Sequence, residues 1–471
     1  MNELTVYLDP NSSKKLYEQI YEYIVTEIRT GKLLYGERLP STRSLAETLG
    51  ISRSTTIFAY EQLQAEGYIE SRPYQGYFVC KVEDILKIEP QEKQETKKET
   101  AVQVKQYQID FSPNAIDMTL FPFDTWRRIT RNTLNDDRLE LFSPGAAQGD
   151  FNLRYTISRY LHSARGVSCE PERIIIGAGN EYLLMLLRYI LGEKRRVAME
   201  DPTYKRACRI MQSMDYEICT VEMDRQGMSA RALYESDADT AYVMPSHQYP
   251  TGRIMPIGRR MELLAWASKE DDRYLIEDDY DSEFRYQGKP IPSLQTSDRN
   301  GRVIYIGTFS KAIAPAIRIS YMVLPEKLMQ RYHEKCSFLS STVSRIDQAT
   351  LNEFIQDGFF ERYLNKMRKH YRQKHDLMLG ILKGFGKDFA VSGENAGMYL
   401  LLTSKKGMSG IRMAERARAM NLCVYPLTDY VRNKDSGENE WISHTILLGF
   451  GGLSMEQIRA GLKMLQICLK R

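Results

Sequence analysis

The 471-residue sequence lacks three features that would point to a compartment or a class of site. Its seven cysteines are dispersed and include no C-x-x-C pair, so free thiols in a reducing cytoplasm fit them better than disulfides or zinc. No run approaches the about 18 apolar residues that span a membrane. The opening MNELTVYLDPNSSKKL has no apolar signal core. We therefore expect a cytoplasmic protein with neither a membrane span nor a bound metal.

The chain also has little excess of either charge. Its 65 Lys and Arg residues face 61 Asp and Glu residues, which gives a net charge of +4. Such a balance neither indicates nor excludes a nucleic-acid partner. What the chain does have is core-forming material, since 42% of its residues are hydrophobic and 27% are charged. This length and composition predict a globular protein of two or three domains.

Residues 81–106, KVEDILKIEPQEKQETKKETAVQVKQ, contain no aromatic residue, and six Lys face five Glu and one Asp there. A segment this charged has too little apolar surface to order itself, so we interpret it as a linker, with an exposed helix as the alternative. It separates residues 1–80, called the head below, from residues 107–471, called the body.

The head pattern predicts three helices followed by a hairpin. KKLYEQIYEYIVTEIRTG has apolar residues at helical spacing and ends in glycine. LPSTRSLAETLG predicts a short helix with a capping box from Ser44 to Glu47 and a stop at Gly50. The next helix, in ISRSTTIFAYEQLQAEG, has Ser52 as its N-cap. YIESRPYQGYFV alternates around a turn and predicts a two-stranded wing.

Two short helices joined by a tight turn make a helix-turn-helix. The second helix would present polar side chains able to reach bases and phosphates: Arg53, Ser54, Thr55 and Thr56. The head has eight Lys and Arg residues against ten Asp and Glu residues, so its total charge does not favour DNA. Arg38 and Arg43 nevertheless cluster with Arg53 on the two helices expected to face DNA. A small helical domain with ordinary surface polar residues is the alternative.

GERLPSTRSLAETLGISRSTTIFAYEQLQAEGYIESRPYQGYFV closely resembles the winged helix-turn-helix of GntR-type bacterial transcription regulators. The resemblance covers nearly all of residues 11–80. It implies that the head binds double-stranded promoter DNA. The residues that it assigns to the DNA interface are Arg43 and Arg53 as chief contacts, Ser41, Ser52 and Thr55 as assisting contacts, and Gly76 as the residue that shapes the wing.

The body alternates strands and helices, a pattern typical of an α/β domain with a mostly parallel sheet. RIIIGAG predicts a β-branched strand that ends in glycines, and NEYLLMLLRYIL predicts the helix after it. A glycine-rich turn from strand to helix exposes backbone N–H groups that can bind phosphate. Ala178, Gly179 and Asn180 would form that cradle. Alone this signal is weak, because many such turns carry glycine for steric reasons.

Two further strands deliver polar side chains to the same edge of the predicted sheet. RYLIEDDYDSEFRY ends its apolar run in Glu277, Asp278, Asp279 and Tyr280. RVIYIGTFSK ends in Thr308, Ser310 and Lys311, and Arg318 lies just beyond. Open α/β sheets bind ligands at the carboxyl ends of their strands. An acidic, solvated turn is the alternative for the first motif alone.

Together these residues fit pyridoxal phosphate, whose aldehyde condenses with a lysine such as Lys311. Asp278 would hold the proton on the ring nitrogen, and Tyr280 would donate to the phenolic oxygen. Tyr204 is placed to stack on the ring. The residues expected to hold the phosphate are Gly179, Asn180, Ser310 and Arg318.

IIIGAGNEYLL, PSHQYPTGRIMP, IEDDYDSEF and TFSKAIAPAIRISY make residues 110–471 resemble the fold type I aminotransferases. Head and body in this order resemble the MocR subfamily of GntR regulators, especially its GABA-responsive members. The resemblance implies a winged helix-turn-helix fused to a large α/β domain that binds pyridoxal 5'-phosphate. It implies Lys311 as the aldimine lysine and the Asp278 and Tyr280 roles given above. It also implies that Arg206 contacts a ligand carboxylate and that the protein is a head-to-tail homodimer.

Two departures from the aminotransferase pattern matter. Tyr249 stands where those enzymes place an asparagine that touches the phenolic oxygen of the cofactor. The strand region TILLGFGGL lacks the arginine that clamps a substrate carboxylate, and Asp429 or Tyr430 lies where that clamp is expected. Either Arg432 replaces it, or Arg206 acts alone, or the effector is not a simple GABA-like acid.

The sequence therefore favours a transcription regulator over a working aminotransferase with an appended regulatory head. A winged helix with intact arginines has no use in transamination, whereas a ligand-binding body is useful to a regulator. We expect an effector sensed by aldimine chemistry at Lys311. Three kinds of effector stay open: an amine, an amino acid, or pyridoxal phosphate itself.

Overall fold

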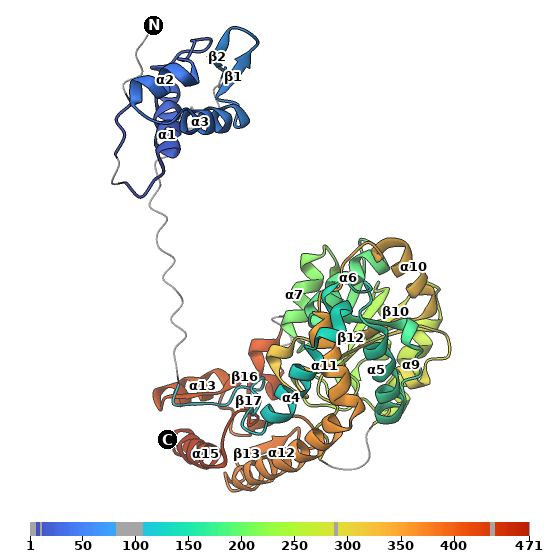
Figure 1. The fold of residues 1–471 in the computed structure, drawn as a ribbon. Helices are drawn as coiled ribbons and strands as arrows, with labels where there is room; N and C mark the ends of the chain where they lie inside the picture. The colour runs from blue at the N-terminus through green and yellow to red at the C-terminus, as the bar shows by residue number, and fades with distance from the viewer. Residues whose placement is uncertain (1–5, 10–11, 82–106, 287–290, 434–438, 471) are drawn as a thin grey trace. The chain divides into compact units, whose positions relative to one another are not determined.

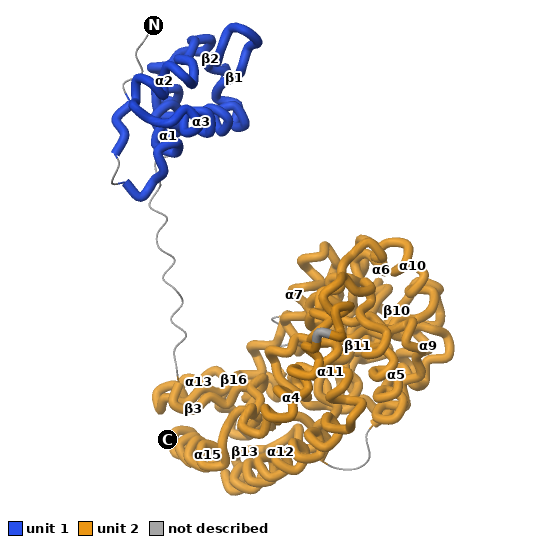
Figure 2. Tube along the Cα trace, viewed as in Figure 1, with its two compact units in different colours: residues 1–105 blue, residues 106–471 orange. Residues whose placement is uncertain are grey.

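The structure is a computed structural model that describes residues 6–9, 12–81, 107–286, 291–433 and 439–470. Two compact units, residues 1–105 and 106–471, make up the chain (Figure 2). The linker predicted at 81–106 lies almost wholly outside the described residues. Each unit is described by itself.

The first unit contains the three helices and the hairpin that the sequence predicts. They are α1 (Leu16–Arg29), α2 (Thr42–Leu49), α3 (Arg53–Ala65), β1 (Ile69–Arg72) and β2 (Gly76–Val79). The two strands pair antiparallel, with Ile69 opposite Val79. Ile20, Ile24 and Leu63 belong to one buried cluster that α1, α3 and the hairpin share. The amphipathic face of α1 thus provides the floor on which the other elements pack.

The capping box expected from Ser44 to Glu47 is not formed. The N-cap of α2 is Ser41, whose hydroxyl accepts a hydrogen bond from the Ser44 backbone N–H at 3.1 Å. Ser41 has the extended backbone typical of an N-cap, with φ −64° and ψ 155°, so the helix begins three residues earlier than a Ser44 cap requires. Ser52 caps α3 as predicted and accepts from the Thr55 N–H at 3.3 Å.

The second unit is built on a seven-stranded sheet of order β4-β12-β11-β10-β9-β5-β6. Among these strands, β12 alone runs in the direction opposite to the other six. The strands are β4 (Ile174–Gly177), β5 (Arg196–Glu200), β6 (Glu217–Val221), β9 (Thr240–Val243), β10 (Tyr274–Asp279), β11 (Val303–Thr308) and β12 (Ser320–Val323). The prediction of an α/β domain with a mostly parallel sheet is therefore confirmed.

Helices cover both faces of this sheet (Figure 1). Along β4, Ile174 and Ile176 join one hydrophobic cluster and Ile175 joins another, because successive side chains point to opposite faces. The helices around the sheet are α4 (Phe123–Thr133), α5 (Phe151–Arg165), α6 (Asn180–Leu191), α7 (Lys205–Ser213), α8 (Ala230–Glu235), α9 (Ile257–Ser268), α10 (Glu326–Cys336) and α11 (Arg345–Gln356).

A smaller antiparallel sheet of order β13-β14-β17-β16 follows in the chain. Its strands are β13 (Phe389–Ser392), β14 (Tyr399–Ser404), β16 (Tyr425–Pro426) and β17 (Thr445–Gly449). Its helices are α12 (Phe359–Lys383), α13 (Gly410–Ala419), α14 (Glu440–Ser443) and α15 (Met455–Lys470). Two short pairs complete the strands: β3 (Ile109–Asp110) with β15 (Leu422–Cys423), and β7 (Met223–Asp224) with β8 (Gly227–Met228).

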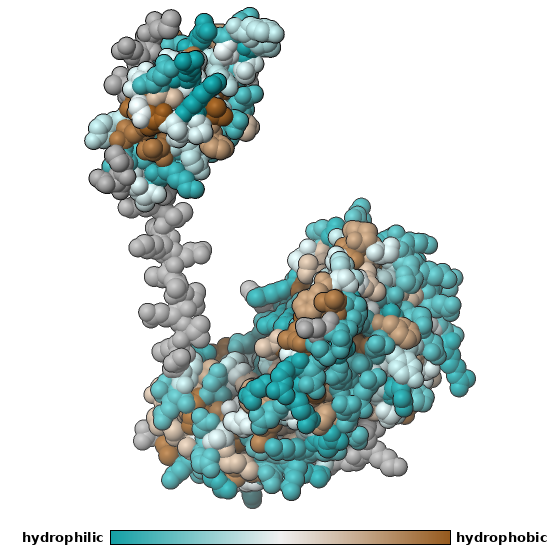
Figure 3. Space-filling view, viewed as in Figure 1, coloured by the Kyte–Doolittle hydropathy of each residue, from teal (hydrophilic) through white to brown (hydrophobic). Residues whose placement is uncertain are grey.

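The visible surface of each unit is mainly hydrophilic, with hydrophobic side chains in scattered patches (Figure 3). Among the residues that the structure describes, none of the helices combines the length and apolar character that a membrane crossing needs. Across the same ranges, no three His, Cys, Asp or Glu side chains are grouped as a metal site would group them.

The corrected cap of α2 gives a test with a matched control. Ser41→Ala should destabilise α2 by about 1 kcal/mol, because one N–H group of its first turn loses its acceptor. Ser44→Ala keeps that acceptor and should change stability by less than about 0.5 kcal/mol. Amide hydrogen exchange in the full-length protein measures both, and α2 should exchange roughly fivefold faster in Ser41→Ala alone. Equal effects of the two substitutions would contradict the Ser41 assignment.

Candidate functional site

A cavity of about 270 Å³ opens at the carboxyl ends of β10 and β11, beside the N-terminus of α6. Nine of the eleven residues that the sequence predicts for cofactor and ligand line it, the exceptions being Gly179 and Arg432. The lining residues are Asn114, Ile116, Asn180, Glu181, Tyr204, Arg206, Met244, Tyr249, Asp278, Tyr280, Thr308, Ser310, Lys311, Pro315 and Arg318.

The acidic end of β10 divides between two faces of the sheet. Asp278 lines the cavity and Tyr280 follows it there, whereas Glu277 and Asp279 make their contacts elsewhere. Glu277 is fully buried and accepts from the backbone N–H groups of Leu294 and Gln295 at 2.7 and 2.9 Å. The four residues therefore do not form one ligand-binding cluster, because the two-residue period of a strand separates neighbours.

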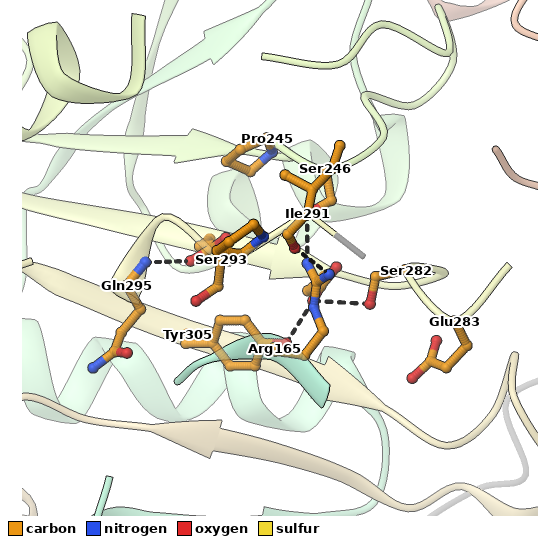
Figure 4. A network of polar contacts seen from close by, with 12 residues as sticks. Arg165, Pro245, Ser246, Ser282, Glu283, Ile291, Ser293, Gln295 and Tyr305 are labelled. Carbon is orange, nitrogen blue, oxygen red and sulfur yellow. Dashed lines mark hydrogen bonds and ion pairs between the residues drawn. The ribbon is translucent and has the colours of Figure 1, made fainter. Parts of the chain in front are cut away.

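Asp279 is paired with Arg165 of α5. Figure 4 shows the polar network around that arginine. The Arg165 Nε donates to the Asp279 carboxylate at 2.7 Å, and Tyr305 of β11 donates to the same oxygen at 2.5 Å. Arg165 also donates to the Ser246 hydroxyl at 2.6 Å and to the Ile291 carbonyl at 2.5 Å. The arginine thus neutralises one buried carboxylate and fixes the loops on either side of it.

Asp278, one residue earlier, has no cationic partner among the residues that the structure describes. It is 4% exposed and receives hydrogen bonds from the Tyr242 hydroxyl and from Asn180 Nδ2, the latter at 3.2 Å. Burial raises the pKa of Asp278 to about 7. A buried carboxylate supported only by neutral donors is energetically unfavourable unless a cationic group joins it. This is the environment that a protonated ring nitrogen requires.

Lys311 lies across the same cavity, just after β11. Its Nζ donates to the carbonyl and side-chain oxygens of Asn114 at 3.2 and 3.4 Å. Burial lowers the pKa of Lys311 to about 8. A neutral amine is the nucleophilic form, so this lysine is prepared to condense with an aldehyde near neutral pH.

The residues predicted for a phosphate cradle lie close together at the start of α6. Arg318 donates to the Ala178 carbonyl at 3.3 Å, and a Cβ on Gly179 would lie 2.1 Å from the Arg318 Nη2. Glycine is required at position 179 for two reasons. Its φ of +94° is unfavourable for other residues, and a side chain there would collide with Arg318. The Ser310 hydroxyl and Asn180 Oδ1 are buried without a hydrogen-bond partner among the described residues. Such orphaned polar atoms indicate that the site is built for a polar group.

A group of aromatic side chains forms one wall. The ring of Tyr249 meets the rings of Tyr204 and Tyr280 edge-on, at centroid distances of 5.7 and 6.1 Å. Tyr249 donates to the Tyr430 hydroxyl at 3.0 Å, so its own hydroxyl is engaged with another tyrosine. The Tyr280 hydroxyl lies 3.0 Å from Nδ1 of His247, a buried side chain that the sequence analysis did not assign to the site.

The two arginines proposed for a ligand carboxylate lie in different places. Arg206 lines the cavity, but its Nη1 donates to Glu181 at 2.9 Å. Arg432 is outside the residues that line the cavity, and its backbone N–H donates to Asp201 at 3.0 Å. The structure therefore brings Arg206 to the site and leaves Arg432 away from it.

Besides His247, three polar residues that line or support the cavity were missed from the sequence. Glu181 directly follows Asn180, and Tyr242 sits on β9 two residues before Met244 of the cavity. Asn114 comes from the segment that enters the body. A polar side chain between apolar strand neighbours is a usable signal for Tyr242, whereas nothing in the local pattern marks Glu181 or Asn114.

In the head, the predicted DNA-binding residues lie at the helix-turn-helix. Arg53 begins α3 and is exposed, while Arg43 of α2 pairs with Glu47 at 3.0 Å. Thr56 is fully buried and donates to the Thr42 carbonyl at 2.8 Å, so its expected exposure is wrong. It packs α3 against α2 instead.

The remaining head residues have structural contacts of their own. Ser41 and Ser52 are the helix caps, and the Ser52 hydroxyl lies 2.9 Å from that of Thr55. Gly76 has φ +106° in the hairpin. Arg38 lies before α2 and forms a β-bridge with Phe78, so it is not on a helix as expected.

Residues 16–79 match the bacterial regulatory proteins of the gntR family, and residues 108–425 match aminotransferase class I and II. The chain is 39% identical over 469 residues to the HTH-type transcriptional regulator YdeL of Bacillus subtilis, covering 99% of this chain and 100% of that protein. It is 29% identical to the probable rhizopine catabolism regulatory protein MocR of Rhizobium meliloti, over 98% and 94%.

It is also 32% identical to the pyridoxine biosynthesis regulator PdxR of Corynebacterium glutamicum, over 97% of this chain and 96% of that one. Among solved structures, the kynurenine aminotransferase of Pyrococcus horikoshii superimposes with a TM-score of 0.67 at 25% identity. That match covers 78% of this chain and 91% of the enzyme.

The unpaired Asp278 predicts a specific pH dependence of stability. Its pKa is about 7 when folded and about 4 when unfolded. The folded protein therefore holds more protons between these values, and the carboxylate lowers stability progressively as pH rises through them. Asp278→Asn removes that cost. Relative to wild type, the free energy of unfolding of the cofactor-free variant should rise by on the order of 2 kcal/mol from about pH 5 to about pH 8.

Asp279→Asn is the matched control. It leaves the buried Arg165 without its carboxylate and should destabilise the protein by about 3–5 kcal/mol at both pH values. Denaturant unfolding at the two pH values measures both variants. A difference between Asp278→Asn and wild type that stays constant with pH would contradict the description of Asp278.

Proposed function

The chain belongs to the GntR family of bacterial regulatory proteins, as an HTH-type transcriptional regulator of the MocR type with an aminotransferase class I and II domain, and on this premise we propose that it senses a small molecule through pyridoxal phosphate held in the body. The head would bind promoter DNA. Occupancy of the cavity in the body would set how strongly the head binds.

One observation carries the cofactor proposal: a buried carboxylate without a cation and a lysine of lowered pKa line the same cavity. Neither group is favourable in isolation, since burial penalises the charged form of both. Pyridoxal phosphate answers both needs, because it carries a basic ring nitrogen for Asp278 and an aldehyde for Lys311. Perturbed groups of this kind gather at functional sites.

The other residues take roles that follow from their positions. Arg318, Ser310, Asn180 and the N–H groups beginning α6 would bind the phosphate. Tyr280, oriented by His247, would donate to the phenolic oxygen. When bound, the cofactor supplies an aldehyde carbon that forms an imine with an amine. The chain itself holds the ring, keeps Lys311 close to that carbon and retains the ring proton at Asp278.

The aromatic wall supports sensing over turnover. Tyr249 replaces the asparagine expected in an aminotransferase, and its hydroxyl is engaged by Tyr430. Arg432 lies outside the cavity, so among the described lining residues Arg206 is the one arginine that the cofactor phosphate does not take. Ligand binding without efficient transamination suits a regulator, and any transaminase activity should be weak. PdxR, whose name assigns it to pyridoxine biosynthesis, supports keeping pyridoxal phosphate itself among the candidate signals.

We further propose that the regulator acts as a head-to-tail homodimer. Leu134, Leu139 and Phe142 are 50%, 74% and 67% exposed on one short segment of the body. Three large apolar side chains exposed within residues 134–142 support a surface that another chain covers. Two linked heads would also raise the local concentration of the second head at a paired DNA site.

The cofactor proposal predicts a covalent label. The protein purified with pyridoxal phosphate should be yellow, and borohydride reduction should attach pyridoxyl mass to the peptide that contains Lys311. Lys311→Ala should lose the label yet keep some cofactor through Arg318 and the phosphate cradle. Peptide mass spectrometry decides the matter, and a label on another lysine, or none, would refute the assignment.

The DNA proposal predicts that substituting Arg53 weakens binding to promoter DNA more than binding to random DNA. Arg53→Ala should weaken binding to the protein's own promoter by about 1–3 kcal/mol if Arg53 reads a base edge in the major groove. Lys14→Ala, which removes a cation paired with Glu22 on the head, is the control and should have little effect. Fluorescence anisotropy on promoter and random DNA measures both. Equal losses on the two DNAs would make Arg53 a phosphate contact, and no binding of wild type to the promoter would refute the regulator proposal.

A further inference from the structure

Glu181 bridges the two arginines of the cavity. Its Oε1 accepts from Arg206 at 2.9 Å, and its Oε2 accepts from Arg318 at 2.6 Å. Burial by itself would raise the pKa of Glu181, but the hydrogen bonds from Arg318 and Arg206 outweigh it and hold that pKa below its ordinary value. Glu181 is therefore an anion fixed at the point where a ligand carboxylate would bind Arg206.

The charges in the cavity leave no cation for a second anion. Its lining contains three basic side chains, Lys311, Arg206 and Arg318, and two carboxyl groups, Asp278 and Glu181. In the proposed function the cofactor phosphate replaces Glu181 as the partner of Arg318. The ring nitrogen pairs with Asp278, and Lys311 forms the covalent bond. Arg206 and Glu181 remain, and they already neutralise each other.

The C-terminal side of the site does not supply a replacement. Arg432 is absent from the lining, and the hydroxyls of Tyr430 and Tyr249 bond to each other. A ligand carboxylate placed beside Arg206 would also lie close to Glu181, and like charges that are close and partly buried repel. The rest of the lining is largely apolar or aromatic, as Ile116, Met244 and Pro315 illustrate.

We propose that Glu181 acts as an internal counter-anion that makes this regulator respond to a primary amine without a carboxylate or other anionic group. The inference rests on the proposed function and adds the chemical class of the effector. Lys311 would hold the carbonyl-derived carbon of the cofactor until an amine replaces it; the bond from that carbon to Lys311 would break as the bond to the amine forms, and the two N–H protons that the neutral amine loses would pass to the Lys311 nitrogen. No oxidant or reductant is consumed, and the tail of the amine meets an apolar wall.

The test compares two ligands of matched chain length, butylamine and 4-aminobutanoate, on the protein loaded with pyridoxal phosphate. The visible absorbance change and the loss of borohydride labelling at Lys311 each give an apparent Kd. Wild type should bind butylamine at least about tenfold more tightly than 4-aminobutanoate. In Glu181→Gln the acid should gain at least about tenfold, because Arg206 becomes free to pair with it. Adding Arg206→Gln to that variant should abolish the gain.

Glu326→Gln is the matched control, because it makes the same change at an exposed glutamate of α10 outside the cavity lining. Its preference should equal that of wild type. The inference is overturned if wild type prefers the acid and Arg206→Gln removes that preference, if Glu181→Gln leaves the preference unchanged, or if neither ligand displaces Lys311. In each of these outcomes a yellow protein with a labelled Lys311 still upholds the proposed function, whereas failure to load the cofactor would refute the function itself.

Discussion

Two neighbouring carboxylates, Asp278 and Asp279, are buried on opposite faces of one strand. The body depends on the difference between them, because Asp279 has a cationic partner and Asp278 has neutral donors. Asp279 meets Arg165 at 2.7 Å and belongs to a closed network that secures the loops behind the sheet. Asp278 meets only neutral donors. If neither carboxylate had a cationic partner, the protein would be less stable. If both had one, no carboxylate would be left to bind a cationic ligand in the cavity. The strand's period allows each carboxylate its own environment.

The same asymmetry explains which parts of the site could be predicted. The motifs around Asp278, Lys311 and Arg318 were readable because each polar residue ends an apolar run, and strand ends in an open sheet meet at one edge. The two-residue period of a strand turns Glu277 and Asp279 away from Asp278, although the sequence motif suggested that all of them reach one edge of the sheet. Partners across the sheet, such as Arg165, lie more than a hundred residues away and leave no local signal.

Glu181 shows most clearly which contacts cannot be predicted from the sequence. Its two arginine partners lie 25 and 137 residues further along the chain, so the bridge exists only once α6, α7 and the turn after β11 have packed together. The cap of α2 is a smaller case: Ser41 and Ser44 are both plausible caps, and the extended backbone of Ser41 decides between them. In the head, Thr56 looked like a DNA contact until the packing of α2 on α3 buried it.

The head has the fold of a DNA-binding domain, and the body has a cavity for a ligand. Regulation requires that DNA binding by the head depends on what the cavity of the body holds. A ligand can shift DNA binding only by the difference in its affinity for the free and DNA-bound forms. The most direct test is the Kd for promoter DNA measured by anisotropy while pyridoxal phosphate is titrated into cofactor-free wild type and Asp278→Ala. We expect the DNA affinity of wild type to change as the cofactor saturates and that of Asp278→Ala to stay constant over the same range. A wild-type DNA affinity that is independent of cofactor, or an identical change in both proteins, would contradict a body that senses through Asp278.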